Sequence, residues 1–365
     1  MKYYLISGEA SGDLHGSNLI KEIHKQDPQA QIRCWGGDLM QAAGAELVSH
    51  YKERAFMGFL EVAMNIRTIL GFMKTCKKDL LAYKPDIVVL IDYPGFNIPM
   101  AQFAKKHGFK TIFYISPQVW AWKEGRVKTI REVVDKMLVI LPFEVDFYKK
   151  WNYEVIYVGH PLVQVIEEFK ADNTALRPPT SVRSVALLPG SRPQEIKKKL
   201  PIMLKATQHF PDVQFRIAQA PSLERSFYES MTAQYPNVEL IQGKTYELLM
   251  QSHAALVTSG TATLETALFG VPEVVCYKGS AVSHEIAKRL IKVKYISLVN
   301  LILDKPTVKE LIQHDLTPEN ITTELKRLLD PAQNVIVKKD LAELWDILSP
   351  GGAASANAAK IIVEY

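Results

Sequence analysis

The strongest constraint on the fold is a regular alternation of short apolar runs with longer stretches of helical pattern. Strands that are buried on both faces and separated by helices are typical of a parallel, doubly wound sheet. The first series of expected strands lies near Lys2–Ile6, Gln31–Trp35, Ile87–Ile91, Lys110–Ile115, Lys136–Ile140 and Val155–Val158. A second series lies near Ser184–Leu188, Gln214–Ala218, Val238–Ile241, Ala254–Val257 and Glu273–Tyr277. The sequence therefore predicts an α/β protein with two Rossmann-like domains.

A break in this alternation marks the expected domain boundary. The first series stops at Gly159-His-Pro161, and the stretch from Glu167 to Ser181 has the character of a helix end followed by a linker. A chain of 365 residues is also longer than one core usually supports. We expect an N-terminal domain over residues 1–165, a second domain over 182–340, and a helical segment over 341–365. That last segment can return to the N-terminal domain of the same chain or of a partner chain.

Composition excludes several classes of protein. The net charge of +5 is too small to indicate a nucleic-acid partner, but it suits anionic small ligands or an acidic lipid surface. The three cysteines, Cys34, Cys76 and Cys276, lie far apart, which argues against disulfides or a cysteine metal site and favours the cytosol. No apolar run approaches the ~18 residues of a membrane span, and Met1–Ser7 has the character of a buried strand rather than a targeting segment.

In the second domain, Ser259-Gly-Thr-Ala-Thr-Leu-Glu265 follows an apolar strand and opens a helix. Such a turn presents backbone N–H groups, here from Ser259, Gly260, Thr261 and Ala262, to the phosphates of a nucleotide sugar, and Glu265 can accept from ribose hydroxyls. The alternative is an ordinary capped helix in which Ser259 or Thr261 is the cap and Glu265 faces water.

Two further segments of this domain are candidates for the same site. Leu188-Pro-Gly-Ser-Arg192 again turns a strand into a helix, so Gly190, Ser191 and Arg192 can meet the same phosphates. Asn300, after the strand-like Tyr295–Leu298, is a further candidate, and its alternative is a turn asparagine.

In the first domain, carboxylates follow two expected strands. Ser7-Gly-Glu-Ala-Ser-Gly-Asp13 leaves the first strand and carries Glu9 and Asp13 at its expected carboxyl end; the alternative is a helix-capping loop. Asp92 ends the strand that precedes it and can accept a proton from a bound hydroxyl. Its alternative is to cap a helix that begins near Asn97, or to shape the turn.

Other residues of the first domain can line a site or simply fill the core. Ser116-Pro-Gln-Val-Trp-Ala-Trp122 places two tryptophans beside cations, which suits a sugar or acyl site as well as plain core. The histidines show no metal-ligand spacing and no Asp-x-Asp pair ends a strand, so we predict no catalytic metal.

The stretch Phe56–Tyr83 is unusually apolar for a helix that covers a small sheet, and Lys74, Lys77, Lys78 and Lys84 lie within or just after it. This mixture suits an element that lies in the plane of a membrane interface, among acyl chains and anionic head groups. A wholly buried helix with a solvated basic end is the alternative.

As a set, these segments resemble one family. Ser7–Asp13, Ile91–Asn97, Ser116–Trp122, Val158–Leu162, Leu188–Arg192 and Ser259–Glu265 occur in the order found in the lipid-A-disaccharide synthases. The resemblance implies the GT-B fold, with two doubly wound domains facing each other across a cleft. It also implies an inverting glycosyltransferase at the cytoplasmic face of the inner membrane of Gram-negative bacteria, and makes a homodimer plausible.

The resemblance further implies the reaction and the roles of the residues. The enzyme would move 2,3-diacylglucosamine from UDP-2,3-diacylglucosamine onto 2,3-diacylglucosamine 1-phosphate (lipid X), giving the β-1,6 disaccharide phosphate and UDP without a cofactor. Asp92 would be the base, with Glu9 in reserve, and Arg192 would contact phosphate. The 259–262 turn would hold the diphosphate, Glu265 the ribose, and Asn300 the donor.

Two other classes of protein fit part of the pattern. A UDP-N-acetylglucosamine 2-epimerase would use the nucleotide site on the same architecture but needs no lipid-facing helix. A non-catalytic peripheral membrane adaptor would explain the basic apolar stretch but not the two nucleotide-type helix openings.

Overall fold

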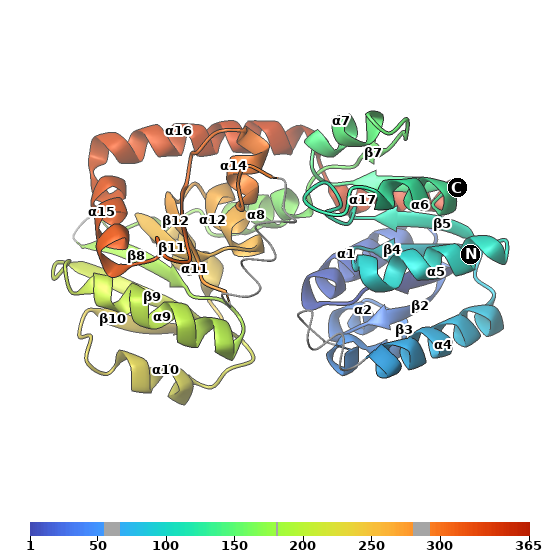
Figure 1. Ribbon diagram of the computed structural model, residues 1–365, viewed down its shortest axis with the longest axis horizontal. Coiled ribbons are helices and arrows are strands. Elements are labelled where there is room, and N and C mark those ends of the chain that lie inside the picture. Colours follow the sequence, from blue (N-terminus) through green and yellow to red (C-terminus); the bar gives the residue numbers. More distant parts are fainter. Residues whose placement is uncertain (55–65, 180–181, 280–292) are drawn as a thin grey trace. The chain divides into compact units, whose positions relative to one another are not determined.

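The computed structural model describes residues 1–54, 66–179, 182–279 and 293–365. By internal contacts the chain divides into two compact units, one made of Met1–Pro161 with Ser349–Tyr365 and the other of Leu162–Leu348 (Figure 1). Each unit is described by itself below.

The described part of the first unit is built on a seven-stranded parallel sheet with the order β3-β2-β1-β4-β5-β6-β7. Its strands are β1 (Lys2–Ile6), β2 (Gln31–Gly36), β3 (Glu46–His50), β4 (Ile87–Ile91), β5 (Lys110–Tyr114), β6 (Lys136–Val139) and β7 (Ile156–Tyr157). Its helices are α1 (Ala10–Gln26), α2 (Asp38–Ala42), η1 (Tyr51–Arg54), α4 (Ile66–Tyr83), α5 (Pro94–Lys106), α6 (Arg126–Val133), α7 (Phe143–Lys149), η2 (Ser349–Gly351) and α17 (Ala354–Val363).

Both faces of this sheet are buried, as the continuous apolar strands predict. In β1, Tyr4 and Ile6 belong to one core, and Tyr3 and Leu5 belong to the core on the opposite face. Successive side chains of a strand point to opposite faces, so β1 contributes to both cores.

The C-terminal helix α17 completes the first unit (Figure 1). Its Ala358 and Ile362 share a core with Leu19 and Ile23 of α1. The returning chain crosses Gly159 closely, since a Cβ on Gly159 would lie 2.6 Å from the Gly351 carbonyl oxygen. The final helix therefore packs on the first unit of its own chain.

The described part of the second unit repeats the plan with a six-stranded parallel sheet of order β10-β9-β8-β11-β12-β13. Its strands are β8 (Arg183–Leu188), β9 (Val213–Gln219), β10 (Val238–Gln242), β11 (Ala254–Thr258), β12 (Glu273–Tyr277) and β13 (Lys309–Ile312). Its helices are α8 (Pro161–Asp172), α9 (Pro193–Thr207), α10 (Arg225–Thr232), α11 (Thr245–Met250), α12 (Thr261–Leu268), α14 (Leu298–Leu303), α15 (Pro318–Leu329) and α16 (Pro331–Leu348).

Two strands, β3 and β13, were not expected from the sequence. Both lie at the edge of their sheets, and most of their residues are partly or fully exposed, with Leu311 the buried exception. An edge strand needs no continuous apolar run, because only one side of it is paired and its faces reach solvent. Apolar runs therefore identified every central strand and the edge strands β7 and β10, but not the edge strands β3 and β13.

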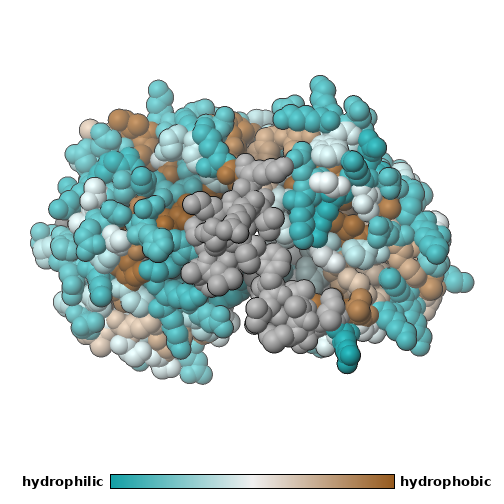
Figure 2. Space-filling model, viewed as in Figure 1, coloured by the Kyte–Doolittle hydropathy of each residue, from teal (hydrophilic) through white to brown (hydrophobic). Residues whose placement is uncertain are grey.

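Hydrophilic residues predominate on the face seen in Figure 2, with apolar residues scattered singly. Of the helices that the structure describes, none combines the length and the hydropathy that crossing a bilayer requires. The apolar stretch from Phe56 begins outside the described residues, which resume at α4. On α4, Cys76 and Leu80 are buried, while Leu70 and Leu81 are 56% and 41% exposed.

Candidate active site

The loops that carry Glu9 and Asp92 lie side by side at the carboxyl edge of the first sheet. β1 pairs with β4 in parallel, with Ile6 opposite Leu90, so the segments that leave these strands begin next to each other. The strand order reverses between β1 and β4, and open α/β sheets bind ligands outside the strand ends at such a switch point. The structure thus brings together the two carboxylates proposed from the sequence.

Asp92 is held in an unusual backbone conformation. Asp92 and Tyr93 have φ angles of 45° and 51°, in the left-handed region that residues with a side chain seldom adopt. The Tyr93 ring packs directly on Gly8, where a Cβ would lie 2.3 Å from the ring, and it stacks on Phe96 with centroids 5.6 Å apart. Strain of this kind persists where the surroundings impose it, and it is common in active sites.

Asn97 fixes the same two strand ends. Its buried Nδ2 donates to the carbonyl oxygens of Ile6 at 3.3 Å, Ile91 at 3.1 Å and Asp92 at 2.7 Å. One side chain therefore joins the end of β1 to the end of β4 and to the backbone of Asp92. The sequence analysis treated Asn97 only as the start of a helix. The signal that could have pointed to this role is an asparagine five residues after a strand-end carboxylate.

The alternative role of Asp92 as a helix cap is wrong. The helix begins at Pro94 rather than near Asn97, and its N-cap is Tyr93, not Asp92. Asp92 is an exposed residue, so a ligand can approach its loop, although the protein around the carboxylate removes much of its water. Its role as a base stays a prediction.

Asp92 has the electrostatics of a base that works near neutral pH. Burial of the carboxylate by surrounding protein and the nearby charge of Glu9, in that order, raise the pKa of Asp92 to about 6, and the Tyr93 N–H opposes this. A pKa near the working pH suits a general base, which must be ionised and yet basic.

Asp13 has a structural role instead. It lies within α1, is buried, and accepts hydrogen bonds from the backbone N–H groups of Gly37 at 2.8 Å, Leu39 at 3.1 Å and Met40 at 3.1 Å. The expectation that Asp13 joins Glu9 at the strand end is wrong, because its carboxylate is used to cap α2. Glu9 is exposed and makes no side-chain cap bond to α1, so it is the carboxylate of this loop that a ligand can reach.

The tryptophan loop after β5 is anchored by a buried carboxyl. Trp120 Nε1 and the Leu141 N–H both donate to Glu144, each at 3.1 Å. Glu144 is 1% exposed, and burial raises its pKa to about 7. Trp122 is partly exposed, with Lys123 Nζ 4.4 Å from its ring centroid and Arg126 5.7 Å away. Trp120 is thus tied to the protein, whereas Trp122 and its cations reach the surface.

The second unit repeats this arrangement at its own switch point. β8 pairs with β11, with Leu188 opposite Val257, and the strand order reverses between them. The turns 189–192 and 259–260 leave these neighbouring strands at their carboxyl ends. The two phosphate-binding segments proposed from the sequence therefore lie side by side.

Glycine is required where the two turns meet. Gly190 has a φ of 118°, and a Cβ there would lie 2.8 Å from Glu195 Oε2 and 3.6 Å from Thr258 Oγ1. Beside it, Ser191 is exposed, and the Arg192 side chain is 47% exposed and 3.5 Å from Glu195. A surface pair of this kind contributes at most about 1 kcal/mol, so the guanidinium can turn to a ligand at little cost.

The first turn of α12 is open. Its N-cap is Gly260, which has no side chain, so neither Ser259 nor Thr261 occupies the N-cap position of the alternative interpretation. Gly260 and Thr261 are exposed and Ser259 and Ala262 are partly exposed. Uncapped N–H groups at a helix start suit an anion.

Glu265 does not simply face water. It is partly buried, accepts a hydrogen bond from the Tyr246 hydroxyl at 2.8 Å, and has its pKa raised by burial. The alternative in which Glu265 simply faces water is therefore also wrong.

Asn300 lies inside helix α14 rather than after a strand, and it is 1% exposed. Its Nδ2 donates to the Val308 carbonyl at 2.8 Å and to Glu310 at 3.0 Å, and its Oδ1 accepts from the Val308 N–H at 2.9 Å. Direct contact with a ligand would require one of these bonds to open.

Among the described residues, His, Cys, Asp and Glu side chains form no group of three or more that could hold a metal ion.

Two doubly wound α/β units, each with polar loops at its switch point, define a GT-B protein, and this fold class is confirmed. The chain also resembles two solved structures at low identity. It matches CalG4, the calicheamicin glycosyltransferase, with a TM-score of 0.67 at 16% identity, covering 100% of this chain and 97% of that one. It matches the UDP-GlcNAc 2-epimerase from Neisseria meningitidis with a TM-score of 0.65 at 15% identity, covering 100% and 99%.

Sequence comparison separates these possibilities. Residues 3–362 match the family model described as Lipid-A-disaccharide synthetase. The Lipid-A-disaccharide synthase of Syntrophus aciditrophicus is 43% identical over 97% of this chain and 95% of its own length. The chain belongs to the lipid-A-disaccharide synthase family, so it is a glycosyltransferase of lipid A disaccharide synthesis. The likeness to the epimerase extends to the fold alone.

Proposed function

We propose that this enzyme transfers 2,3-diacylglucosamine from UDP-2,3-diacylglucosamine to the 6-hydroxyl of 2,3-diacylglucosamine 1-phosphate, with inversion. The family supplies the reaction class. The observation that carries the assignment of residues is Asp92, an exposed residue whose carboxyl has a pKa near 6 at the switch point of the first sheet.

Inversion needs a single displacement. The acceptor 6-hydroxyl gives its proton to the Asp92 carboxylate, and its oxygen forms a bond to the anomeric carbon of the donor. The bond from that carbon to the UDP oxygen breaks on the opposite side, so UDP leaves with the electron pair and the product is the β-anomer. Glu9 favours proton uptake by Asp92 because its negative charge raises the pKa of Asp92.

The second unit binds the donor in this proposal. Arg192 and the backbone N–H groups of residues 259–262, beside Gly190 and Ser191, take up the negative charge that develops on the diphosphate. The free oxygen of Glu265 accepts from ribose. Asn300 supports the donor site from within α14.

We propose that no divalent ion takes part. Two observations support this proposal. The Arg192 guanidinium and the start of α12 can neutralise a diphosphate, and the sequence contains no Asp-x-Asp pair.

We also propose that the enzyme works at the cytoplasmic face of the inner membrane, because both sugars carry acyl chains. Moving one methylene of an acyl chain from the bilayer into water costs ~0.8 kcal/mol, so the enzyme must offer the chains an apolar surface or act at the membrane. On α4, Leu70 and Leu81 are exposed beside exposed Lys74 and Lys78, which fits an interfacial face. The remaining apolar residues of this stretch, Phe56 to Met64, lie outside the described residues. A homodimer is the accompanying proposal, which sedimentation velocity would test.

The direct test supplies the purified protein with the two acylated sugars, the acceptor radiolabelled, and follows the disaccharide by thin-layer chromatography. We expect stoichiometric UDP, and a one-bond carbon–proton coupling at the new anomeric centre typical of a β linkage. An α linkage would contradict inversion.

The Asp92→Asn variant should bind UDP normally, by calorimetry, and lose transfer. Turnover of UDP-N-acetylglucosamine without any acylated acceptor would favour an epimerase. Absence of a thermal shift with UDP would favour a non-catalytic adaptor.

A further inference from the structure

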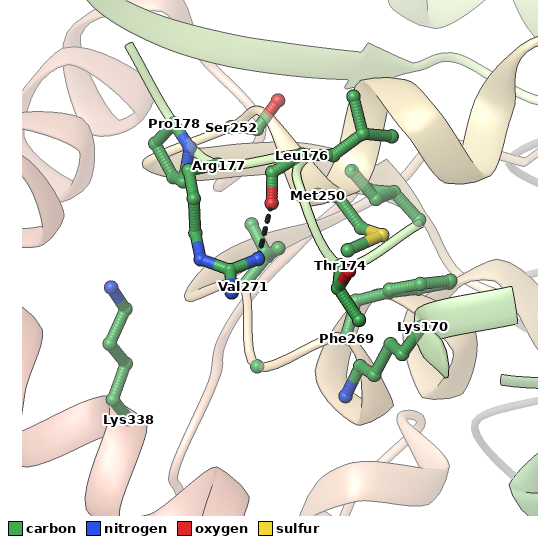
Figure 3. A pocket seen from close by; sticks show the side chains of 12 residues that line it. Lys170, Thr174, Leu176, Arg177, Pro178, Met250, Ser252, Phe269, Val271 and Lys338 are labelled. Atoms are coloured by element: carbon green, nitrogen blue, oxygen red, sulfur yellow. Dashed lines mark hydrogen bonds between the residues drawn. The ribbon is translucent and has the colours of Figure 1, made fainter. Parts of the chain in front are cut away.

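A pocket lies in the second unit, at the end of the sheet opposite the proposed donor site. It has a volume of about 370 Å³ and is bounded by the end of α8 and the segment after it, by the turns before β11 and β12, and by α16 (Figure 3). Those turns precede the amino ends of the strands, whereas the phosphate-binding turns follow the carboxyl ends. The two sites are therefore separate.

The pocket concentrates positive charge. Lys170, Arg177 and Lys338 line it, and none of the described residues in its wall is acidic. Arg177 Nη1 donates to the Leu176 carbonyl at 2.6 Å and Lys170 Nζ to the Leu268 carbonyl at 2.7 Å. These carbonyls carry no net charge, so among the lining residues the positive charges are not neutralised.

The field of this cluster acts on neighbouring groups. After burial, Lys338 and then Arg183 lower the pKa of His253. Glu167 offsets part of the charge of Lys170, whose pKa is lowered by burial. No carboxylate accompanies Arg177 or Lys338 among the described residues that line the pocket; the Arg177 guanidinium turns to the Leu176 carbonyl, and the Lys338 side chain lines the same pocket (Figure 3). Bringing two cations together is unfavourable unless an anion lies between them.

Most of the remaining wall is apolar, with Thr174 and Ser252 as its uncharged polar side chains. Met250, Phe269 and Val271 line the pocket beside Pro178. Lys170 Nζ lies 5.6 Å from the centroid of the Phe269 ring, so the charged and apolar parts adjoin each other. A volume of about 370 Å³ falls within the range of sites for small molecules.

We propose that this pocket binds a phosphate ester that carries an apolar group. Arg177 and Lys338 hold the phosphate between them, and the apolar group lies against Phe269 and Val271. Phosphate is favoured over a carboxylate because its charge of about −1.5 to −2 matches two cations and its oxygens suit the planar guanidinium. The ligand is either a soluble phosphate ester or the head group of a membrane lipid.

The first experiment measures the affinity of the full chain for three probes by isothermal titration calorimetry. Inorganic phosphate represents the charged part of the ligand, hexanol represents the apolar part, and hexyl phosphate contains both. Hexyl phosphate should bind at least about tenfold more tightly than either of the others, since only it engages both parts of the pocket.

The double variant Arg177→Ser/Lys338→Gln should weaken hexyl phosphate binding at least about tenfold. The matched control is Lys339→Gln, an equally exposed lysine on α16 that does not line the pocket, and it should leave binding unchanged. The thermal shift with UDP should be the same in all three proteins, which also shows that they are folded. The proposal is wrong if the double variant binds hexyl phosphate like the parent, if Lys339→Gln weakens it equally, or if hexanol binds as well as hexyl phosphate.

Co-sedimentation with vesicles identifies the source of the ligand. If the double variant loses binding to vesicles that contain phosphatidic acid, whose head group is a phosphate monoester, as well as to hexyl phosphate, and Lys339→Gln loses neither, the ligand is a lipid head group. If vesicle binding is unchanged while hexyl phosphate binding is lost, the ligand is a soluble ester. Sugar transfer is measured separately, so its failure leaves this result intact.

Discussion

The charge of Glu9 is expected to set the pH at which sugar transfer is lost. Burial, and after it Glu9, raises the pKa of Asp92 to about 6. Asp92 must be ionised to accept a proton, so kcat/KM should fall as the pH drops through about 6. Glu9→Gln removes the second of these causes and should move the midpoint to lower pH. Burial remains, so the midpoint should stay above that of an ordinary aspartate.

The size of the effect follows from the titration. At one pH unit below the pKa only about a tenth of the carboxylates are ionised, so kcat/KM of the parent should be about tenfold below its plateau near pH 5. The Glu9→Gln variant should keep a larger share of its own plateau at that pH. Asp92→Asn should lose about 10²–10⁴ in rate throughout.

The assay is the initial rate of disaccharide formation at limiting acceptor over about pH 5–8. A phosphate monoester also titrates near pH 6, and the acceptor contains one. The measured quantity is therefore the difference in midpoint between variants that share the same substrate. Glu132→Gln, which removes an exposed charge on α6, is the control and should leave the midpoint in place.

Equal midpoints in the parent and in Glu9→Gln would refute the proposed coupling between the two carboxylates. If Glu9→Gln abolishes transfer while Asp92→Asn stays active, the base is Glu9.

Three further outcomes are expected. Glu144→Ala should lower the free energy of unfolding in urea by ~1–3 kcal/mol for each donor left unsatisfied. Glu124 accepts from the Trp151 indole but is itself less buried than Glu144, so Glu124→Ala should cost only ~0.5–1.5 kcal/mol. Equal losses would contradict the role of burial. Gly8→Ala should lower both Tm and kcat, because the added Cβ would lie 2.3 Å from the Tyr93 ring. The control Gly95→Ala, where a Cβ meets nothing within 4 Å, should leave both near the parent values. A Gly8→Ala enzyme with normal Tm and kcat would show that the Tyr93 ring is not fixed. Dialysis against EDTA should leave transfer unchanged, and a loss restored by Mg²⁺ would overturn the metal-independent mechanism.

Local signals in the sequence were sufficient for much of the fold. The central strands are continuous apolar runs because both of their faces are buried, and they were placed to within a residue or two. The strand-end segments could also be found, because glycines, carboxylates and helix starts recur where parallel strands end. Pairing of β1 with β4 and of β8 with β11 then brought the candidate segments together in each unit.

Side-chain partners were less predictable, as Asp13 and Asn300 illustrate. Asp13 lies four residues after Glu9, but its carboxylate is bonded to the start of α2, some two dozen residues away in the chain. Asn300 is bonded to Val308 and Glu310, across a turn that the sequence does not announce. Both residues are polar and close to candidate motifs, so type and spacing alone could not separate a positioning role from a ligand contact.

The sequence by itself determined the alternation of strands and helices, the two sheets, and the loops at their carboxyl ends, because backbone hydrogen bonding and burial of a strand's faces depend on residues close in the chain. Only the tertiary structure decided which carboxylates stay accessible, where the edge strands pair, that α17 packs beside α1, and that Lys170, Arg177 and Lys338 share one pocket. These outcomes depend on contacts between residues far apart in the chain, such as the hydrogen bond from Gln26 Nε2 to the Ala356 carbonyl oxygen across 330 positions, and such contacts leave no periodic signal in the sequence.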